Sequence, residues 1–326
     1  KAAEFLNNPF MNNTCRIASG YLGSLLARQR PTWDFSAKEA NLDSVGLYAL
    51  WLLMESNMTL QKLVLRGNSV GKQYEDSAGL AKMFATSTAL TSLDLSQNCL
   101  GALKRTTVGL RQLSRGLSTS KSLLELDLSS NELWPDGVRS ICNALRQCTA
   151  MLRVDLSYNH PGRETALADL LRVHTNLQRL AVIEAAPQTR IERSFHLDNR
   201  GKEQIGRALL ESNATLRYLL CDTFALDENT TTLLWASDQQ NDAVLLAGAL
   251  KSNDKLTTIN LNGGKTAEGL EATLGDFERE EIGRALLRNL NGRVGYSDIF
   301  SLRKDGPKQQ TFDLKDKTQV RSFRSF

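Results

Sequence analysis

The chain has 326 residues, of which 41% are hydrophobic and 23% charged, a composition typical of folded globular proteins. Its net charge of +4 on 36.2 kDa is too small to indicate nucleic-acid binding. The longest apolar run, Val45 to Met54, is much shorter than the roughly 20 residues that span a bilayer, so we expect no membrane insertion.

The five cysteines are scattered and lack the C-x-x-C spacing of zinc sites or small disulfide frameworks. We therefore expect reduced thiols and an intracellular, cytoplasmic protein, with a cilium, the cytoskeleton or an organelle as further possibilities. The five are Cys15, Cys99, Cys142, Cys148 and Cys221.

The N-terminal region differs in pattern from the centre of the chain. We expect residues 1–32 to form a helical cap, with a helix over Asn12–Arg28. Trp33 to Phe35 then resembles a short strand, and Leu42–Ser56 a helix, together a degenerate first repeat.

A repeated pattern dominates the centre of the chain. The pattern is L-x-x-L-x-L-x-x-N-x-L, and it begins at Leu60, Leu90, Leu123 and Met151, with weaker copies at Leu177, Leu216 and Leu256. Its L-x-L pair points two side chains inward from a short strand, and the asparagine turns the chain. In the three weaker copies Ala185, Phe224 and Gly264 replace the asparagine.

Each strand is followed by a segment with the i, i+3, i+4 apolar spacing of an amphipathic helix. No repeat can bury its own core, so neighbouring repeats must stack into a right-handed solenoid. The predicted helices are Gly79–Ser87, Thr107–Ser118, Gly137–Gln147, Glu164–Val173, Lys202–Glu211, Ala243–Lys251 and Glu280–Asn289.

The unit LLELDLSSNELWPDGVRSICNALRQC, Leu123–Cys148, resembles the ribonuclease-inhibitor class of leucine-rich repeat (LRR). The resemblance covers Phe35 to Leu290. It implies an α/β fold: a right-handed LRR solenoid, shaped as a horseshoe or arc, of about seven to eight strand–helix repeats with a parallel concave sheet. The same class occurs in NLR-type immune sensors and Ran GTPase-activating proteins. We expect the LRR domain to span residues 33–290.

A basic, irregular tail follows at residues 291–326. Its eight Lys or Arg residues and four Asp residues give +4, so residues 1–290 are electrically neutral. Such a segment cannot build a core. We expect a neighbouring molecule, rather than the solenoid's own last repeat, to hold the tail through Phe312, Arg321, Phe323, Arg324 and Phe326.

The residues favour no catalytic, cofactor or metal site. His160, His174 and His196 fall in three different repeats, without carboxylate or cysteine at ligand spacing. Gly67 to Lys72 superficially resembles a phosphate-binding loop, but it lacks one residue between its glycines and the following Ser or Thr. We therefore expect a protein that is not an enzyme.

The strand positions between the core leucines should line the concave face. Asp94, Asp127 and Asp155 then form a column, with strands about 4.8 Å apart. Like charges so close are unfavourable unless a partner relieves them. With Glu125 beside it, this column suits a basic segment of another protein. The alternative is that L-D-L-S is simply a common repeat sequence.

Three later repeats carry long insertions, at Glu184–Arg200, Thr223–Gln239 and Gly263–Gly275. Insertions in successive repeats emerge along one edge, where apolar residues can dock a partner or pack on the solenoid itself. The predicted anchors on this insertion edge are Phe195, Phe224 and Trp235, with Trp134 of the third repeat.

The sequence thus predicts a non-catalytic protein–protein interaction scaffold, working as a structural subunit of a larger intracellular assembly. Two alternatives stay open: a GTPase regulator of the Ran-activating type, and an LRR sensor fragment of an NLR-like protein. Because residues 1–290 carry no net charge, nucleic acid is the least favoured partner.

Overall fold

The computed structural model describes residues 31–36, 50–51, 54, 59–68, 70, 74–98, 100–101, 108–162, 165–183, 197–235, 237, 239–260, 276–290 and 311–312. The chain divides into two compact units. The first comprises Lys1–Leu170 with Ala181–Leu197, and the second Leu171–Leu180 with Asp198–Phe326. The predicted N-terminal helix at Asn12–Arg28 lies outside the described residues.

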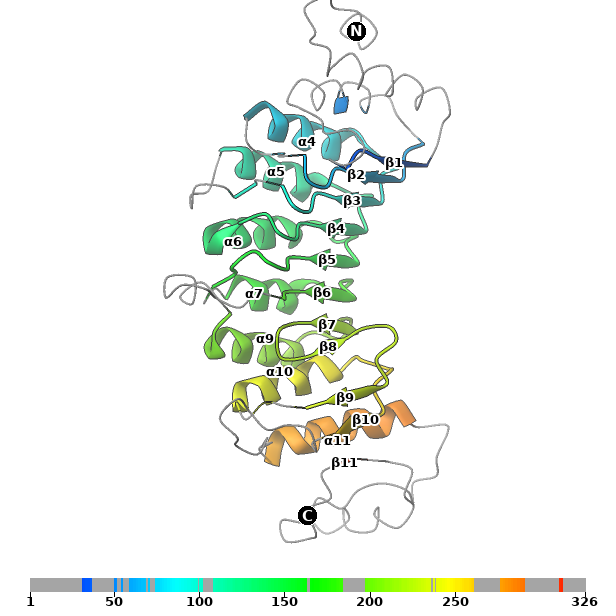
Figure 1. Cartoon of the computed structure of the whole chain (residues 1–326), viewed down its shortest axis with the longest axis vertical. Coiled ribbons are helices and arrows are strands. Elements are labelled where there is room, and N and C mark those ends of the chain that lie inside the picture. The colour runs from blue at the N-terminus through cyan, green and yellow to red at the C-terminus, as the bar shows by residue number, and fades with distance from the viewer. Residues whose placement is uncertain are drawn as a thin grey trace, which may run out of the picture. The chain divides into compact units, whose positions relative to one another are not determined.

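Parallel strands in chain order form the sheet of the first unit (Figure 1). They are β1 (Thr32–Asp34), β2 (Lys62–Val64), β3 (Ser92–Asp94), β4 (Glu125–Asp127) and β5 (Arg153–Asp155). The middle residue of each strand is buried and the outer two are not, because successive side chains alternate between the two faces. The predicted strand register is confirmed.

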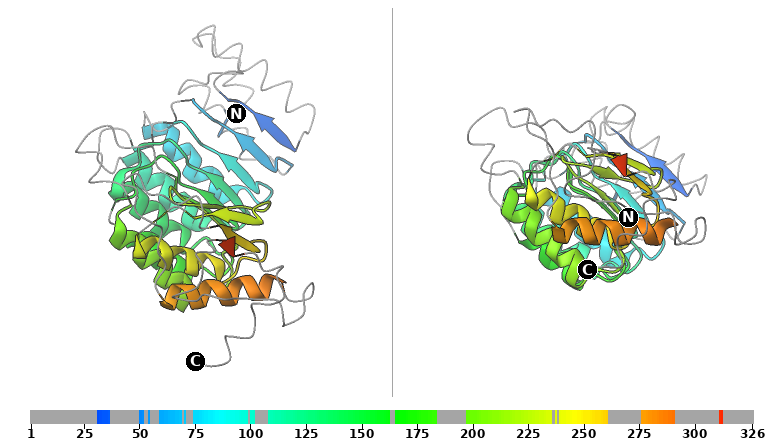
Figure 2. Two further views of the ribbon diagram at one scale, coloured as in Figure 1. Left: turned by 60° about the horizontal axis from the view of Figure 1, so that its bottom comes forward. Right: turned by 90° about the horizontal axis from the view of Figure 1, so that it is seen from below.

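Helices pack behind these strands in the first unit. They are α4 (Tyr74–Thr86), α5 (Val108–Thr119) and α6 (Trp134–Leu145), followed by α7 (Ala166–Val173), which continues into the second unit. Their buried leucines, isoleucines and valines meet those of the strands, so the core lies between the two layers (Figure 2). Each helix overlaps the segment predicted from apolar spacing.

The second unit contains more strands than predicted. After β6 (Arg179–Ala181), which also spans the division, come α9 (Asn199–Glu211), β7 (Tyr218–Leu220), β8 (Ala225–Leu226), β9 (Thr232–Leu234), α10 (Gln240–Leu250), β10 (Thr258–Asn260), α11 (Asp276–Leu290) and β11 (Thr311–Phe312). β8 pairs antiparallel with β7, and β9 pairs parallel with β10.

The segment Thr223–Gln239, which we expected to be a loop, therefore holds two strands. Thr232 of β9 is the register partner of Thr258, 26 residues later, which is the spacing of a regular repeat. The buried Leu233 and Trp235 take the inward positions of the L-x-L pair. The predicted insertion is thus wrong here: it consists of the turn-back strand β8 and one further repeat strand.

Helices α9 and α10 approach each other at two glycines of the second unit. A Cβ on Gly206 would lie 2.6 Å from the carbonyl oxygen of Val244, and one on Gly248 would lie 2.5 Å from that of Gly206. Neither position has room for a side chain. In both units, strand–helix repeats stack in chain order, so the fold is the predicted leucine-rich-repeat solenoid.

Candidate functional site

The structure brings the three predicted aspartates together on the exposed side of the first unit's sheet. Asp94 is the register partner of Asp127, and Asp127 is the register partner of Asp155. All three side chains are half-buried. We call these three residues the acidic column. Their placement follows from the L-x-L repeat, which directs the intervening residue outward in every strand.

Each carboxylate of the column also closes a local turn. The Oδ1 atoms of Asp94, Asp127 and Asp155 accept hydrogen bonds at 2.8 Å from the backbone N–H of the serine two residues later. Asp34 of β1 does the same at 2.9 Å with Ser36. The D-x-S sequence is therefore structural as well as acidic: it fixes each carboxylate in orientation without neutralising it.

Asp127, in the middle of the column, is electrostatically strained. Burial raises the pKa of its carboxyl above the ordinary value of 3.8, although hydrogen bonds from Ser129 act in the opposite direction. The negative charges of Asp155 and Asp94 raise this pKa further. A cation placed over the column would relieve both the desolvation and the repulsion.

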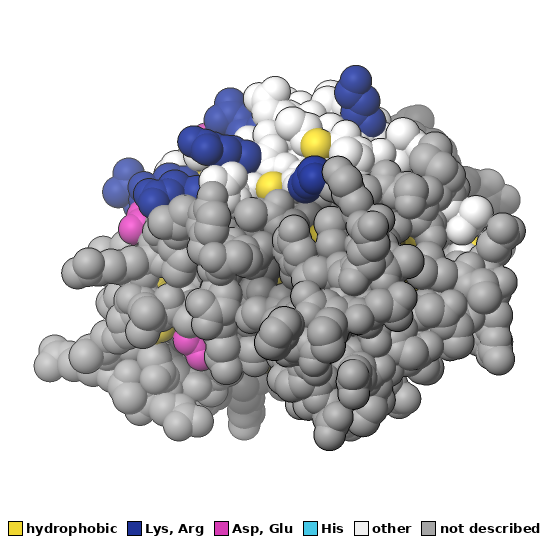
Figure 3. Space-filling view, turned by 90° about the horizontal axis from the view of Figure 1, so that it is seen from above, with side chains coloured by type: hydrophobic (Ala, Val, Ile, Leu, Met, Phe, Trp, Pro, Cys, Tyr) yellow, Lys and Arg dark blue, Asp and Glu magenta, His cyan; other side chains and the backbone are white. Residues whose placement is uncertain are grey.

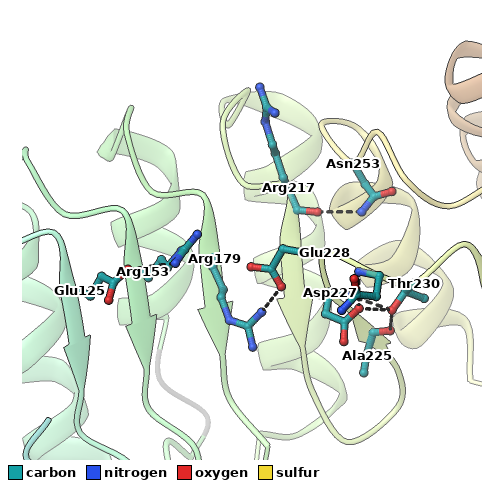
Figure 4. A network of polar contacts seen from close by, with 10 residues as sticks. Glu125, Arg153, Arg179, Arg217, Ala225, Asp227, Glu228, Thr230 and Asn253 are labelled. Atoms are coloured by element: carbon teal, nitrogen blue, oxygen red, sulfur yellow. Dashed lines mark hydrogen bonds and ion pairs between the residues drawn. The ribbon is translucent and has the colours of Figure 1, made fainter. Parts of the chain in front are cut away.

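Glu125 does not act as a free acid beside the column. Its Oε1 atom lies 2.9 Å from Nη1 of Arg153, its register partner on β5 (Figure 4). Both side chains are about half exposed, at 43% and 51%. The pair shows that a carboxylate on this face can bind an arginine. Because Glu125 is paired with Arg153, the remaining negative charges of β4 and β5 are those of the acidic column.

A ladder of buried asparagines holds the strand ends behind the column. The Nδ2 atom of Asn131 donates to the carbonyls of Leu95 and Leu128 at 2.8 and 2.9 Å. The Oδ1 atom of Asn159 accepts from the backbone N–H of Asn131 at 2.9 Å. Because these bonds link successive repeats, the exposed face is a fixed platform.

Two predicted anchors of the insertion edge lie in the interior. Phe224 is 5% exposed and Trp235 is 1% exposed, and their ring centroids are 6.4 Å apart. The prediction that they form a docking edge is wrong, because β8 and β9 carry them into the core of the second unit. Leu234 is the exposed apolar residue there, at 56%. Phe195 lies outside the described residues.

Trp134 occupies a position where the other clear repeats have glycine. The residue three after the turn asparagine is Gly71, Gly101 and Gly162 in those repeats. Trp134 has a positive φ of 54°, as Gly162 has at 67°, and this conformation is unfavourable for a large side chain. Its indole is half-buried and stacks on the imidazole of His160, with centroids 4.9 Å apart.

The two described residues of the tail pair with the chain's own last repeat. Thr311 and Phe312 of β11 are register partners of Asn260 and Ile259 in β10, in an antiparallel pairing. This pairing is the alternative in which the solenoid's own last repeat holds the tail, and binding of Phe312 by a neighbouring molecule stays a prediction. The other predicted tail contacts, Arg321, Phe323, Arg324 and Phe326, lie outside the described residues.

Sequence reasoning missed a buried ionic cluster in the second unit. Nζ of Lys202 in α9 lies 2.7 Å from Oδ1 of Asp242 in α10, with side-chain exposures of 17% and 6%. Thr223 and Ser237 donate hydrogen bonds to the same carboxylate. The cluster ties the segments around β8 and β9 to both helices. The repeat pattern gives no signal for this pair, because the pair depends on how α9 packs against α10.

The loop after β8 is held in place by polar contacts (Figure 4). Oε2 of Glu228 lies 2.7 Å from Nη1 of Arg179 in β6. Asp227 accepts hydrogen bonds from the Thr230 hydroxyl and the Asn229 backbone, and these bonds hold the pKa of Asp227 below its ordinary value. This loop is therefore a fixed part of the second unit.

Neither a metal-binding group nor a reactive thiol is found among the described residues. They contain no group of three or more His, Cys, Asp or Glu side chains that could hold a metal ion. Burial raises the pKa of the Cys142 thiol to about 12 and those of Cys148 and Cys221 to about 11, which makes these thiols poor nucleophiles. No helix in the described part of the chain is long and apolar enough to cross a membrane.

Comparison with known proteins agrees with the repeat pattern. Residues 86–102 and 119–142 match the family model described as Leucine Rich repeat. Pig (Sus scrofa) ribonuclease inhibitor is 29% identical over 146 residues, which are 44% of this chain and 30% of that protein. Rat (Rattus norvegicus) NACHT, LRR and PYD domains-containing protein 1a allele 1 is 28% identical over 178 residues, 52% of this chain and 14% of that protein.

A third relative is bovine (Bos taurus) Tonsoku-like protein, 35% identical over 125 residues, which are 37% of this chain and 9% of that protein. The chain therefore spans less than a third of the length of each of these relatives.

Proposed function

Because the chain carries leucine-rich repeats similar to those of ribonuclease inhibitor, we propose that it is a non-catalytic scaffold that binds other proteins, and that the acidic column receives a basic segment of one partner. The observation that carries this proposal is the strained carboxylate of Asp127, flanked in register by two further carboxylates. Guanidinium or ammonium groups stabilise such an arrangement through charge-assisted hydrogen bonds.

Three features support binding through this face. The column is fixed by the D-x-S turns and the asparagine ladder, so little conformational entropy is lost when a partner binds. The neighbouring Glu125–Arg153 pair is an example, on the same strands, of an arginine bound by a carboxylate. Tyr158, three residues after Asp155, is 46% exposed and offers an aromatic face to a cation.

We further propose that the protein works as an intracellular structural subunit of a larger assembly. We assign it two binding segments, the acidic column and the basic tail at residues 291–326, because a scaffold that holds several partners needs more than one.

The size of the native protein in gentle cell lysate tests this function. The wild type should travel in a large complex, and the variant with Asp94→Asn, Asp127→Asn and Asp155→Asn should lose at least one component. A matched control is Asp136→Asn, Glu203→Gln and Glu280→Gln, which removes three helix carboxylates, two of them exposed and that of Glu203 half-buried. Elution as a single chain near 36.2 kDa at low and high salt would contradict the proposal.

A further inference from the structure

A second charged surface, of opposite sign, lies on the helix side of the first unit. Its five members are all exposed and belong to α4, α5, α6 or the turns that follow α5 and α6. We call them the basic cluster: Lys82, Arg111, Arg115, Lys121 and Arg146. Figure 3 shows Lys and Arg side chains on the upper left of the face seen from above, with Asp or Glu side chains beside them; Figure 1 has the helices on that side.

Two of these charges are carried by helix segments whose backbones are in contact. A Cβ on Gly116 of α5 would lie 2.4 Å from the Cα atom of Ala81 in α4, so the two helices touch at this point. Lys82 follows Ala81, and Arg115 precedes Gly116. Both residues are also five positions before a buried serine that ends the repeat, so they occupy equivalent places on the two helices.

The two arginines of helix α5 are placed where they destabilise the helix. Its sequence, VGLRQLSRGLST, contains two arginines and no acid. Arg111 and Arg115 are four residues apart and therefore neighbours on one face, where like charges repel. Arg111 also lies in the first turn, where the helix dipole disfavours a cation. The helix fold alone gives no reason for this placement.

Four members of the basic cluster have no carboxylate partner among the described residues: Arg111, Arg115, Lys121 and Arg146 form no ion pair there. Asp136 of α6 pairs instead with Arg139, which lies 3.3 Å away on the same helix. These four residues therefore present uncompensated positive charge, whereas the strands of the same unit present the acidic column.

We propose that the basic cluster docks an acidic, Asp- or Glu-rich segment of a partner protein. Three of the five residues are arginines, whose planar guanidinium groups bind carboxylates in a bidentate manner. Among the described residues, the large hydrophobic side chains that are exposed are Tyr158, Val173 and Leu234, none of them on α4, α5 or α6. Within the described side chains of these three helices, no aromatic ring is exposed to form the platform on which single-stranded nucleic acid stacks.

A binding titration tests the proposal on the whole chain. The probe is a fluorescein-labelled peptide of alternating glutamate and serine, followed by fluorescence anisotropy at low salt. The variant Arg111→Gln, Arg115→Gln and Lys121→Gln removes three charges of the cluster, and we expect it to weaken binding about tenfold or more. The matched control, Arg207→Gln, Arg217→Gln and Arg284→Gln, removes three exposed arginines elsewhere and should change binding less than about twofold.

Failure of the wild type to bind the peptide, or an equal loss in the control, would overturn the proposal. An oligouridine of the same length is the second probe. Tighter binding of the RNA than of the peptide, lost in the cluster variant, would assign the cluster to phosphates and also overturn it. Unchanged thermal unfolding of both variants, followed by circular dichroism, shows that the substitutions act on the surface and not on the fold.

Discussion

Asp127 and Asp155 are register partners on adjacent parallel strands, two carboxylates that face the same exposed side of one sheet. Each is fixed by the backbone N–H of the serine two residues later, so neither can turn away from the other. The same turns that order the sheet therefore keep these two negatively charged carboxylates close together, although they repel each other. This coupling of structure and charge is the physical basis of the proposed binding face.

The Asp127→Asn variant should become more stable relative to the wild type as the pH increases, because the wild type loses stability. The folded-state pKa of Asp127 lies above the unfolded value near 3.8, so the folded state binds the proton more tightly. The wild type therefore loses stability as pH rises from that value through the folded pKa, whereas Asn does not titrate. The amide oxygen of Asn can still accept from the Ser129 N–H.

Urea unfolding of both proteins at several pH values from 4 to neutral measures this difference. A wild type that gains stability over the variant as pH rises would show that Asp127 forms a stabilising ion pair in the folded state and would contradict the assignment.

Asn131→Ala should destabilise the protein by about 2–4 kcal/mol, because carbonyls of two repeats lose a buried donor. The side chain of Asn131 is 0% exposed, so water cannot replace it readily. Chemical denaturation gives the free energy of unfolding. Asn143→Ala, on the exposed side of α6, is the control and should cost less than about 0.5 kcal/mol. Equal effects would show that the ladder is dispensable.

Trp134→Gly should be more stable than Trp134→Ala by about 1 kcal/mol, the reverse of the usual order near a helix. Both substitutions lose the stacking on His160, but only glycine adopts a φ of 54° without strain. Thermal unfolding of the two variants compares them directly. If the alanine variant is the more stable, the backbone at this position is not constrained as described.

Gly206→Ala should cost about 1–3 kcal/mol, because a methyl group would collide with the backbone of Val244 in α10. Gly137→Ala is the milder comparison, since its nearest neighbours are side-chain atoms of Leu110 and Leu133, at 3.0 and 3.2 Å. Urea unfolding of the pair should rank Gly206→Ala as the more damaging. The opposite order would mean that α9 and α10 separate easily.

The regular part of the fold was predictable because the repeat pattern specifies the position and the buried face of each strand. L-x-L fixes which residues point inward, and a one-residue error in register would expose every leucine. The acidic column followed from the same rule. The strand β9 could not be predicted, because its segment departs from the repeat pattern L-x-x-L-x-L. Thr230 stands at the first leucine position and Trp235 at the third.

The interior position of Phe224 and Trp235 could not be predicted for the same reason. Without a visible repeat strand their segment resembles a loop, and apolar residues in a loop suggest a docking surface. The strain at Trp134 needed a different signal. Glycine at the same place in the other clear repeats marks Trp134 as an exception in the sequence, but the partner ring of His160 comes from the next repeat. Charge pairing such as Lys202–Asp242 depends on helix packing that no repeat pattern specifies.

The most direct test of the binding face is the affinity of a fluorescein-labelled peptide of alternating arginine and serine, measured by anisotropy at low and high salt. We expect the Asp94→Asn, Asp127→Asn, Asp155→Asn variant to bind about tenfold or more weakly than the wild type at low salt, and the difference to shrink at high salt. The control with Asp136→Asn, Glu203→Gln and Glu280→Gln should bind like the wild type. Equal affinity of the wild type and the column variant would contradict the proposed role of the acidic column.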